Sequence, residues 1–315
     1  MEITQFSQES IEHPDRCEDA LVIFDGANST PTRWAPVFAV IDGMGGHQHR
    51  DKKGNLVTGR EAAQVIRDVL IEDLEHLPAD IDAGLDGRAQ QAVSSAIRRA
   101  HQRVYQELNS ADDLDALHRV GAVLTVAVVC ENGKRILVAQ IGDTRGYMYS
   151  DGELIQLCTD EDNIELLVRQ HGLSEEDAEK VSAIVNAYDG VHEPKADGTI
   201  RIGGQEFDLY MAWRWFVDGN PALNIPAANV VINTLGLTEA DPVLEQSRIE
   251  ISTGDILCLC SDGLYKNLSD QEIVSGLKGT GDLATALGNA ALGRSKDSSN
   301  RRMNPDDISA IAIRF

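Results

Sequence analysis

The sequence predicts an α+β fold in which mainly antiparallel β-sheets are covered by helices. Neighbouring apolar runs are joined by tight turns at Glu131–Lys134 and Ser150–Gly152, which are hairpin signals and favour antiparallel pairing. The long helical patterns come in pairs between groups of strands, and this order favours helices layered outside the sheets. Because no Pro- or Ser-rich linker divides residues 1–315, we expect a single domain.

The first third of the chain contains one buried strand and two amphipathic helices. Residues 36–41 read PVFAVI, an apolar run that stops at an Asp-Gly pair. Thr58 and Glu61 form a capping box, after which apolar residues recur at helical spacing. A second helical pattern covers residues 89–108. Each helix is expected to lay its apolar stripe on a sheet.

Hairpins and helices follow, with one stretch that lacks a clear period. Residues 188–228 are punctuated by Gly, Asp and Pro, and within them only Phe207–Phe216 is predicted as a strand. The chain ends on a predicted strand, Ile308–Ile313. The other predicted elements are strands at 122–130, 135–141, 145–149, 153–157 and 255–261, and helices at 161–170, 174–187, from 269, and at 283–292.

Composition and charge exclude several classes of function. Lys and Arg total 28 and Asp and Glu total 51, so the formal net charge is 28 − 51 = −23. Nucleic acid and anionic membranes are not expected as partners, because binding their phosphates depends on Lys and Arg. The first residues lack the basic and apolar regions of a secretory signal, and the five cysteines show neither disulfide nor zinc spacing. We therefore expect a cytoplasmic protein.

Aspartates stand at the ends of the predicted strands. Asp42, Asp143 and Asp262 follow strands, whereas Asp306 and Asp307 precede the last one. In an antiparallel pair, the end of one strand and the start of its neighbour share an edge, so these carboxylates are expected to converge. Converging carboxylates raise one another's pKa unless cations neutralise them. Oxygen ligands select Mg²⁺, Mn²⁺ or Ca²⁺. Each Asp-Gly pair by itself also fits an ordinary turn.

The chain resembles the metal-dependent (type 2C) Ser/Thr protein phosphatases, the PPM family, over about residues 10 to 315. The form DGMGGH is similar to the bacterial branch of that family. The matching blocks run in the family's order and are RCEDA (16–20), VIDGMGGH (40–47), GAVLTV (121–126), IGDTRG (141–146), GDILCLCSDGL (254–264) and PDDIS (305–309).

The resemblance implies a four-layer αββα sandwich, two mainly antiparallel sheets flanked by helices, with two Mn²⁺ or Mg²⁺ ions at one end. The resemblance further implies that a water activated by both metals attacks phosphorus, without a covalent intermediate. The implied metal residues are Asp42 as the bridge, Gly43 through its carbonyl, Asp262 and Asp306 on the other ion, Glu18 and Asp19 on metal-bound waters, and Asp143 with Asp262 on a weaker third ion.

Two candidate catalytic residues depart from the family pattern. Asp42 and Asp262 match it as catalytic residues, but the phosphate-binding Arg of many members corresponds to Pro14. Arg16 is the nearest alternative, and it also fits a surface charge. The His that directly follows the Asp-Gly pair in many members is Met44 here, so His47 is the candidate acid, with a loop His as the alternative. A variable helical or flap insertion is expected at about 160–228.

The sequence therefore predicts a metal-dependent phosphatase that hydrolyses phosphoserine and phosphothreonine in proteins. The predicted partner is a phosphorylated protein substrate, with no nucleic acid and no membrane, and the chain is expected to be a monomer. Two alternatives remain open at this point. One is a weak or inactive pseudophosphatase that acts as a binding or signalling module, and the other is a phosphatase for a small metabolite.

Overall fold

The computed structural model describes most of the chain, including every predicted metal ligand. The predicted helix at 161–170 lies outside the described residues except for its first residue. The described residues are 1–11, 13–26, 34–51, 53–110, 114, 118–161, 172–185, 196–218, 233–238, 244–297, 299–300 and 302–315.

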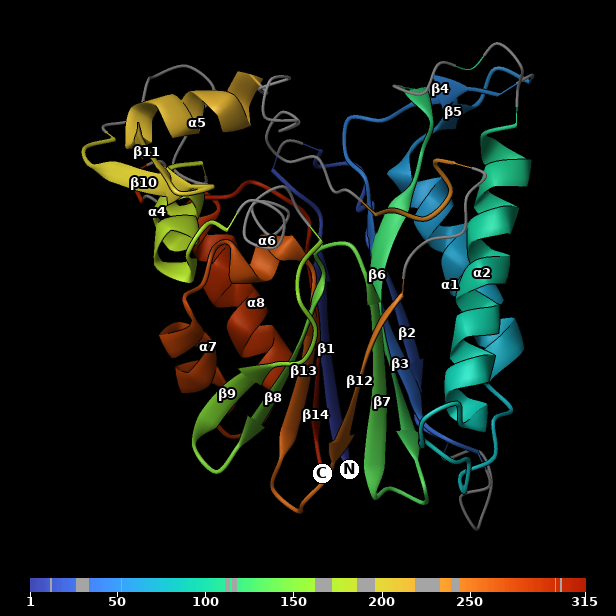
Figure 1. Ribbon diagram of the computed structural model, residues 1–315. Helices are drawn as coiled ribbons and strands as arrows, with labels where there is room; N and C mark the ends of the chain where they lie inside the picture. The colour runs from blue at the N-terminus through green and yellow to red at the C-terminus, as the bar shows by residue number, and fades with distance from the viewer. Residues whose placement is uncertain are drawn as a thin grey trace.

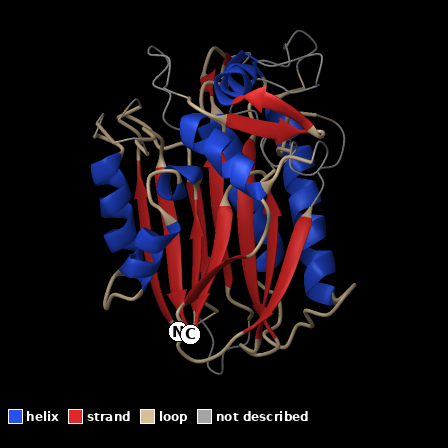
Figure 2. Ribbon diagram, turned by 60° about the vertical axis from the view of Figure 1, so that its left-hand side comes forward, coloured by secondary structure: helices blue, strands red, loops and turns tan. Residues whose placement is uncertain are grey.

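Two five-stranded sheets form the centre of the molecule, and every strand pair in them is antiparallel (Figures 1 and 2). In spatial order, the first sheet is β12 (Glu245–Glu250), β7 (Arg135–Ile141), β6 (Ala122–Cys130), β3 (Val37–Gly43) and β2 (Ala20–Phe24), and the second is β1 (Glu2–Gln8), β14 (Ile308–Arg314), β13 (Ile256–Cys260), β8 (Arg145–Ser150) and β9 (Glu153–Gln156).

Helices cover the outer face of each sheet. On the first sheet lie α1 (Gly59–Leu74) and α2 (Arg88–Leu108), and on the second lie α7 (Asp270–Leu277) and α8 (Leu283–Arg294), as Figure 1 shows. The predicted capping boxes start α1 at Thr58 and α7 at Ser269, where each hydroxyl accepts a backbone N–H and the Glu three residues on accepts the cap N–H.

Three apolar layers hold this sandwich together. One lies between α1, α2 and the first sheet and includes Ile66, Leu70 and Leu124. The middle layer joins the two sheets through residues such as Phe38 and Leu259. A third layer packs the second sheet against α7 and α8. The predicted four-layer αββα arrangement is therefore confirmed, and its middle layer explains why β3, β6 and β13 are buried on both faces.

A smaller region lies above the second sheet in Figure 1. It contains α4 (Glu175–Val185), the hairpin of β10 (Thr199–Ile202) and β11 (Gln205–Asp208), and α5 (Leu209–Asp218), with an apolar cluster of its own. The predicted strand Phe207–Phe216 is wrong, because residues from Leu209 onward form α5. Leu209, Ala212 and Trp213 are buried at positions i, i+3 and i+4, which is helical spacing. The predicted single domain with an insertion at about 160–228 stays a prediction.

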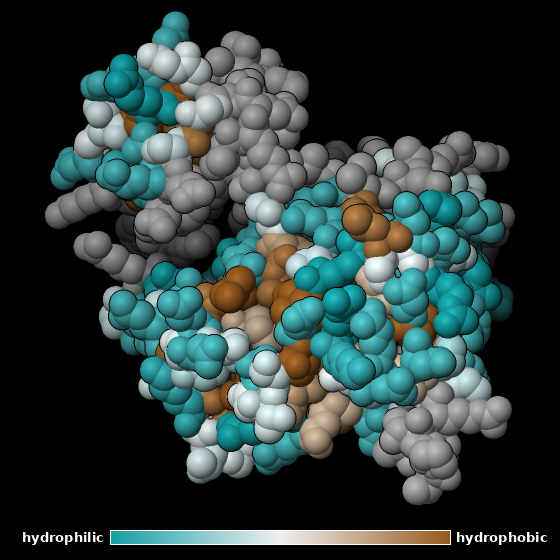
Figure 3. Space-filling view, turned by 60° about the horizontal axis from the view of Figure 1, so that its bottom comes forward, coloured by the Kyte–Doolittle hydropathy of each residue, from teal (hydrophilic) through white to brown (hydrophobic). Residues whose placement is uncertain are grey.

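The two ends of the sandwich differ. The chain termini lie together at one end (Figure 1), and that end presents a mostly hydrophilic surface with apolar side chains scattered over its centre (Figure 3). The opposite end carries the turns after β3, β7 and β13 and before β14. None of the helices in the described ranges is both long and apolar enough to cross a membrane.

Candidate metal centre

Acidic residues from both sheets meet at the end of the sandwich away from the termini. The β13–β14 register pairs Cys260 with Ala310, so Asp262 and Asp306 lie at the same edge of the second sheet. Gly263 contacts this edge so closely that a Cβ would collide with the Asp307 carbonyl oxygen. On the first sheet, Asp42 lies at the end of β3. Burial, followed by the charges of Asp19, Asp262 and Asp306, raises the pKa of Asp42, so acids from both sheets form one cluster.

Close backbone contacts position Asp42. A Cβ on Gly43 would lie 2.5 Å from the Glu18 carbonyl oxygen and 2.5 Å from the Gly59 carbonyl carbon, so only glycine fits there. The amide of Met44 donates to the Gly121 carbonyl at 3.0 Å. The start of α1, the segment before β2 and the end of β3 are therefore held against one another at Asp42.

A buried carboxylate fixes the segment that carries Glu18 and Asp19. Asp307, only 4% exposed, accepts the backbone N–H of Ser10 and of Glu18, each at 2.6 Å. Arg16 lies beside this segment, with its Nε 2.8 Å from Glu18 Oε1. Asp307 therefore ties the chain before β2 to the start of β14, and this tie places Glu18 and Asp19 at the acidic end.

A lysine that the sequence reasoning missed lies inside the cluster. The Nζ of Lys266 is 2.5 Å from Asp262 Oδ2 and 3.8 Å from Asp143 Oδ2. Lys266 caps the short helix α6 (Asp262–Tyr265) at its C-terminal end, four residues after Asp262. The i, i+4 spacing after the CSDGL block is the signal that could have found it. Although burial lowers the pKa of Lys266, the charges of Asp262 and Asp143 raise it well above its usual value.

The pKa values at this end are strongly perturbed. Burial, followed by repulsion from Asp307, raises the pKa of Asp19 well above its usual value. Burial, followed by repulsion from Asp19, does the same to Asp42. Desolvation by neighbouring protein atoms, followed by repulsion from Asp262, raises the pKa of Asp306 to about 7. Part of this side chain is nevertheless open to solvent.

Several buried carboxylate oxygens lack a hydrogen-bond donor. Both oxygens of Asp19, Oε2 of Glu18 and Oδ1 of Asp262 have no hydrogen-bond partner in the described part of the chain. An unpaired buried carboxylate is costly, so such oxygens fit a bound cation with its waters. Among the described residues, however, no three Asp, Glu, His or Cys side chains are arranged to hold one metal ion together. The donors are all oxygens, which suits hard ions such as Mg²⁺ and Mn²⁺.

The two candidate catalytic residues outside the acidic set lie in different surroundings. Arg16 reaches the cluster through Glu18, and 28% of its side chain is exposed. His47 lies on the loop after β3, and its Nδ1 is 2.9 Å from the Arg119 carbonyl oxygen. Because a carbonyl oxygen can only accept, Nδ1 carries a proton and donates it. The structure thus brings Arg16 to the acidic end, whereas the hydrogen bond of His47 is to loop backbone.

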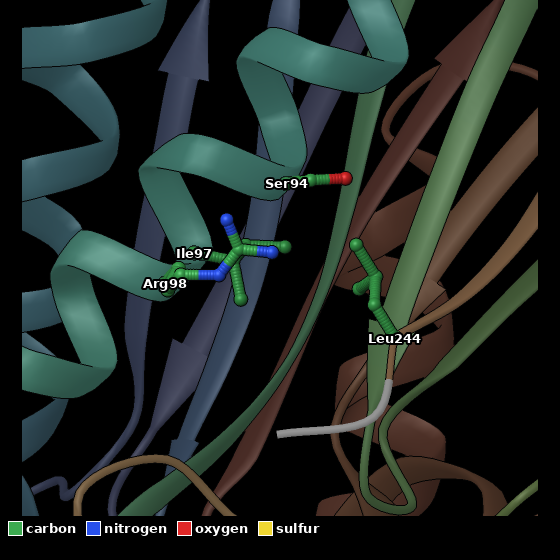
Figure 4. Close-up of a pocket in the computed structure, with 4 residues that line it drawn as sticks. All are labelled: Ser94, Ile97, Arg98 and Leu244. Atoms are coloured by element: carbon green, nitrogen blue, oxygen red, sulfur yellow. The ribbon is translucent and has the colours of Figure 1, made fainter. Parts of the chain in front are cut away.

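Two cavities among the described residues lie beside α2. One of about 180 Å³ is lined by Ser94, Ile97 and Arg98 of α2 and by Leu244 before β12 (Figure 4). A second, of about 340 Å³, lies further along α2 and includes Tyr105 and Thr238 in its lining. None of the acidic residues named above lines either cavity.

Comparison with known proteins gives the family to which this fold and its acidic end belong. The chain matches the family model "Protein phosphatase 2C" over residues 9–284, so it belongs to the protein phosphatase 2C family. This membership confirms the resemblance inferred from the motif blocks.

Known relatives include bacterial phosphatases. The chain is 25% identical over 244 residues to "Serine/threonine protein phosphatase PstP" of Mycobacterium tuberculosis, covering 78% of this chain but 34% of that protein. It is 24% identical over 245 residues to "Serine/threonine phosphatase stp" of Listeria monocytogenes, covering 77% of this chain and 72% of that protein. The match therefore spans about a third of the length of the mycobacterial relative.

Solved structures share the fold. The serine/threonine phosphatase Stp1 from Staphylococcus aureus superposes with a TM-score of 0.64 at 21% identity, covering 100% of this chain and 95% of that one. The serine/threonine phosphatase of S. agalactiae superposes with a TM-score of 0.66 at 19% identity, covering 100% of this chain and 99% of that one.

Proposed function

We propose that this chain is a metal-dependent protein phosphatase that hydrolyses phosphoserine and phosphothreonine. The observation that carries the proposal is the group of buried, unpaired carboxylate oxygens on Asp19, Glu18 and Asp262 at an open end of the sandwich. Carboxylates in this state need cations. Membership of the protein phosphatase 2C family and the similarity to bacterial serine/threonine phosphatases support phosphoproteins as substrates.

Divalent cations are proposed to lie between the two sheets. Bound there, they would activate a water and neutralise the phosphate oxygens. Mn²⁺ and Mg²⁺ both suit an all-oxygen donor set, and a solved structure of PstP is described in complex with two manganese ions. The residues proposed to hold the metals are Asp42, the Gly43 carbonyl, Asp262 and Asp306, with Glu18 and Asp19 holding metal-bound waters.

The side chains of this protein have separate proposed tasks around the phosphate. Arg16 is proposed to bind the phosphate, because its planar guanidinium matches phosphate oxygens and Glu18 holds it at the site. His47 is proposed as a proton donor or acceptor. Its Nδ1 proton is used by the Arg119 carbonyl, which leaves Nε2 for the substrate.

The cellular setting belongs to the same proposal. A cytoplasmic location is supported by five free cysteines, four of them buried, which suit a reducing compartment. A monomer that binds phosphoproteins and neither nucleic acid nor membrane is supported by the net charge of −23.

An assay with defined substrates tests this function. The purified protein is expected to hydrolyse an aryl phosphate and phosphoserine and phosphothreonine peptides in the presence of Mn²⁺. Activity should vanish in EDTA and return when Mn²⁺ is restored. An absence of turnover with every divalent cation tried would contradict the proposal. Turnover of small phosphorylated metabolites with none on phosphopeptides would move the substrate class away from proteins.

A further inference from the structure

Lys266 bridges the two aspartates of the second sheet. Its Nζ lies 2.5 Å from Asp262 Oδ2 and 3.8 Å from Asp143 Oδ2. The side chain of Lys266 is 20% exposed, and those of Asp143 and Asp262 are 10% and 11% exposed. The ammonium group therefore occupies the space between two buried carboxylates that come from different strands. Asp143 lies just before β8, and Asp262 lies just after β13.

The short helix that carries Lys266 is anchored on several sides. The hydroxyl of Tyr265 donates to the Asp143 carbonyl at 2.8 Å, and the Arg145 guanidinium lies 3.6 Å from the centre of the Tyr265 ring. The amide of Asn267 donates to the carbonyls of Gly263 and Asn304, each at 2.8 Å. Because the residues on both sides of Lys266 are held in place, its ammonium is aimed at the same two carboxylates.

Because of the lysine, the two carboxylate oxygens of Asp262 have different surroundings. Oδ2 is used by Lys266, whereas Oδ1 is buried and has no hydrogen-bond partner in the described ranges. Asp262 therefore keeps one oxygen, on the side away from the lysine, for a divalent ion. On the other side, one positive charge already faces the two negative charges of Asp143 and Asp262. The electrostatic attraction for a further divalent ion is reduced there.

We propose that Lys266 is a built-in cation that takes the place of a third metal ion between Asp143 and Asp262. In this arrangement Asp143 is a partner of the lysine rather than a metal ligand, and the acidic end holds two divalent ions only. Lys266 is thus a positioning residue that fixes the metal count and the orientation of Asp262. The inference rests on the proposed metal-dependent function.

Counting bound Mn²⁺ tests this inference directly. Equilibrium dialysis, with free Mn²⁺ measured by electron paramagnetic resonance, is expected to give two ions for the wild-type protein. Lys266→Met removes the charge at similar volume, so it is expected to bind a third ion. The double variant Lys266→Met/Asp143→Asn should return to two. Lys278→Met is the matched control, because Lys278 also caps a helix but is exposed, and it should bind two.

The outcomes separate this inference from the function on which it rests. A wild-type protein that binds no Mn²⁺ contradicts both. Two ions in both the wild-type protein and a folded Lys266→Met, or three in the wild-type protein, contradict only the role of Lys266. If circular dichroism shows that Lys266→Met does not fold, the number of Mn²⁺ ions bound by the single variant Asp143→Asn tests the inference. This variant should still bind two ions, and a loss of one would show Asp143 to be a ligand and overturn the inference.

Discussion

Carboxylates at the acidic end and carboxylates on the outer helices of this protein differ in their hydrogen-bond partners and in the direction of their pKa shifts. Glu272, at the start of α7, accepts the backbone N–H and hydroxyl of Ser269 and pairs with Arg294. The hydrogen bonds from Arg294 are the largest cause that lowers the pKa of Glu272 to about 2. Asp19 has the reverse setting, because burial and neighbouring acids raise its pKa and its oxygens lack hydrogen-bond partners in the described residues.

This difference shows which acids serve the fold and which serve the site. A carboxylate with donors on every side stabilises the folded chain, whereas one among like charges destabilises it until a cation binds. Glu272 belongs to the first kind, and Asp42 and Asp19 belong to the second. The protein holds the second kind in place with close backbone contacts, such as that between Gly43 and Gly59. The sandwich therefore supplies the stability that the acidic end lacks.

The largest expected effect is the loss of turnover in Asp42→Asn. Asp42 is the proposed bridge between the two ions, so its removal should lower kcat by at least about 10²–10³-fold, the loss typical when charge stabilisation at a reacting centre is removed. Steady-state kinetics with Mn²⁺ and an aryl phosphate measure the change.

The same variant should leave the fold intact and slightly more stable in EDTA, because one like charge is gone. Asp151→Asn, on an exposed turn at positive φ that Asn tolerates, is the control. Unchanged turnover in Asp42→Asn would mean that the acids at this end are not the metal ligands.

An intermediate effect is expected from metal binding on thermal stability. An ion that binds only the folded chain stabilises it by about 2.7 kcal/mol at a concentration 100 times its Kd. The midpoint of thermal unfolding should therefore rise by several degrees with Mn²⁺ and fall back in EDTA. Asp42→Asn should lose most of this rise. An equal rise in the wild-type protein and the variant would place the binding elsewhere.

The smallest effect is expected from Glu272→Gln, which changes a carboxylate that stabilises the fold. Part of the Arg294 pair is exposed and screened by solvent, so the free energy of unfolding should fall by only about 1 kcal/mol. Because the folded pKa of Glu272 is lowered to about 2, its contribution is present above the ordinary pKa of about 4.3 and is lost as pH falls toward 2.

Urea unfolding at pH 7 and at pH 3 measures this contribution, with the exposed Glu153→Gln as control. The gap between the variant and the wild-type protein should narrow at pH 3, and turnover at pH 7 should be unchanged. A gap that widens at pH 3 would contradict the assignment of Glu272 as a stabilising acid.

The sequence predicts the central strands, the long helices and the edge strand β9, but it does not predict the other three edge strands of the two large sheets. The strands β3, β6 and β13 are continuous apolar runs because both of their faces are covered. The strands β1, β2 and β12 have no such pattern and were not predicted. Each is the edge of its sheet and is only partly buried, so its sequence alternates weakly. Phe207–Phe216 was misassigned because its aromatic residues suit a strand as well as a buried helix face.

The sequence also predicts which acids gather but not what surrounds them. Antiparallel pairing of β13 with β14 brings Asp262 and Asp306 to one edge, whereas Asp42 joins them because the two sheets pack face to face. The contact between Lys266 and Asp262 was not predicted, because a helix of four residues is too short to show a helical pattern in the sequence. The tie from Asp307 to the backbone of Glu18 joins residues 289 positions apart, a contact that local patterns do not encode.

Anomalous diffraction at the manganese absorption edge, from crystals grown with Mn²⁺, tests the central claim that acids from both sheets hold divalent ions. The account predicts two anomalous peaks about 3.5–4 Å apart beside Asp42, one of them also close to Asp262 and Asp306. Crystals with Mn²⁺ in solution but no anomalous peak at this end of the sandwich, or with peaks only at other acids, would contradict it.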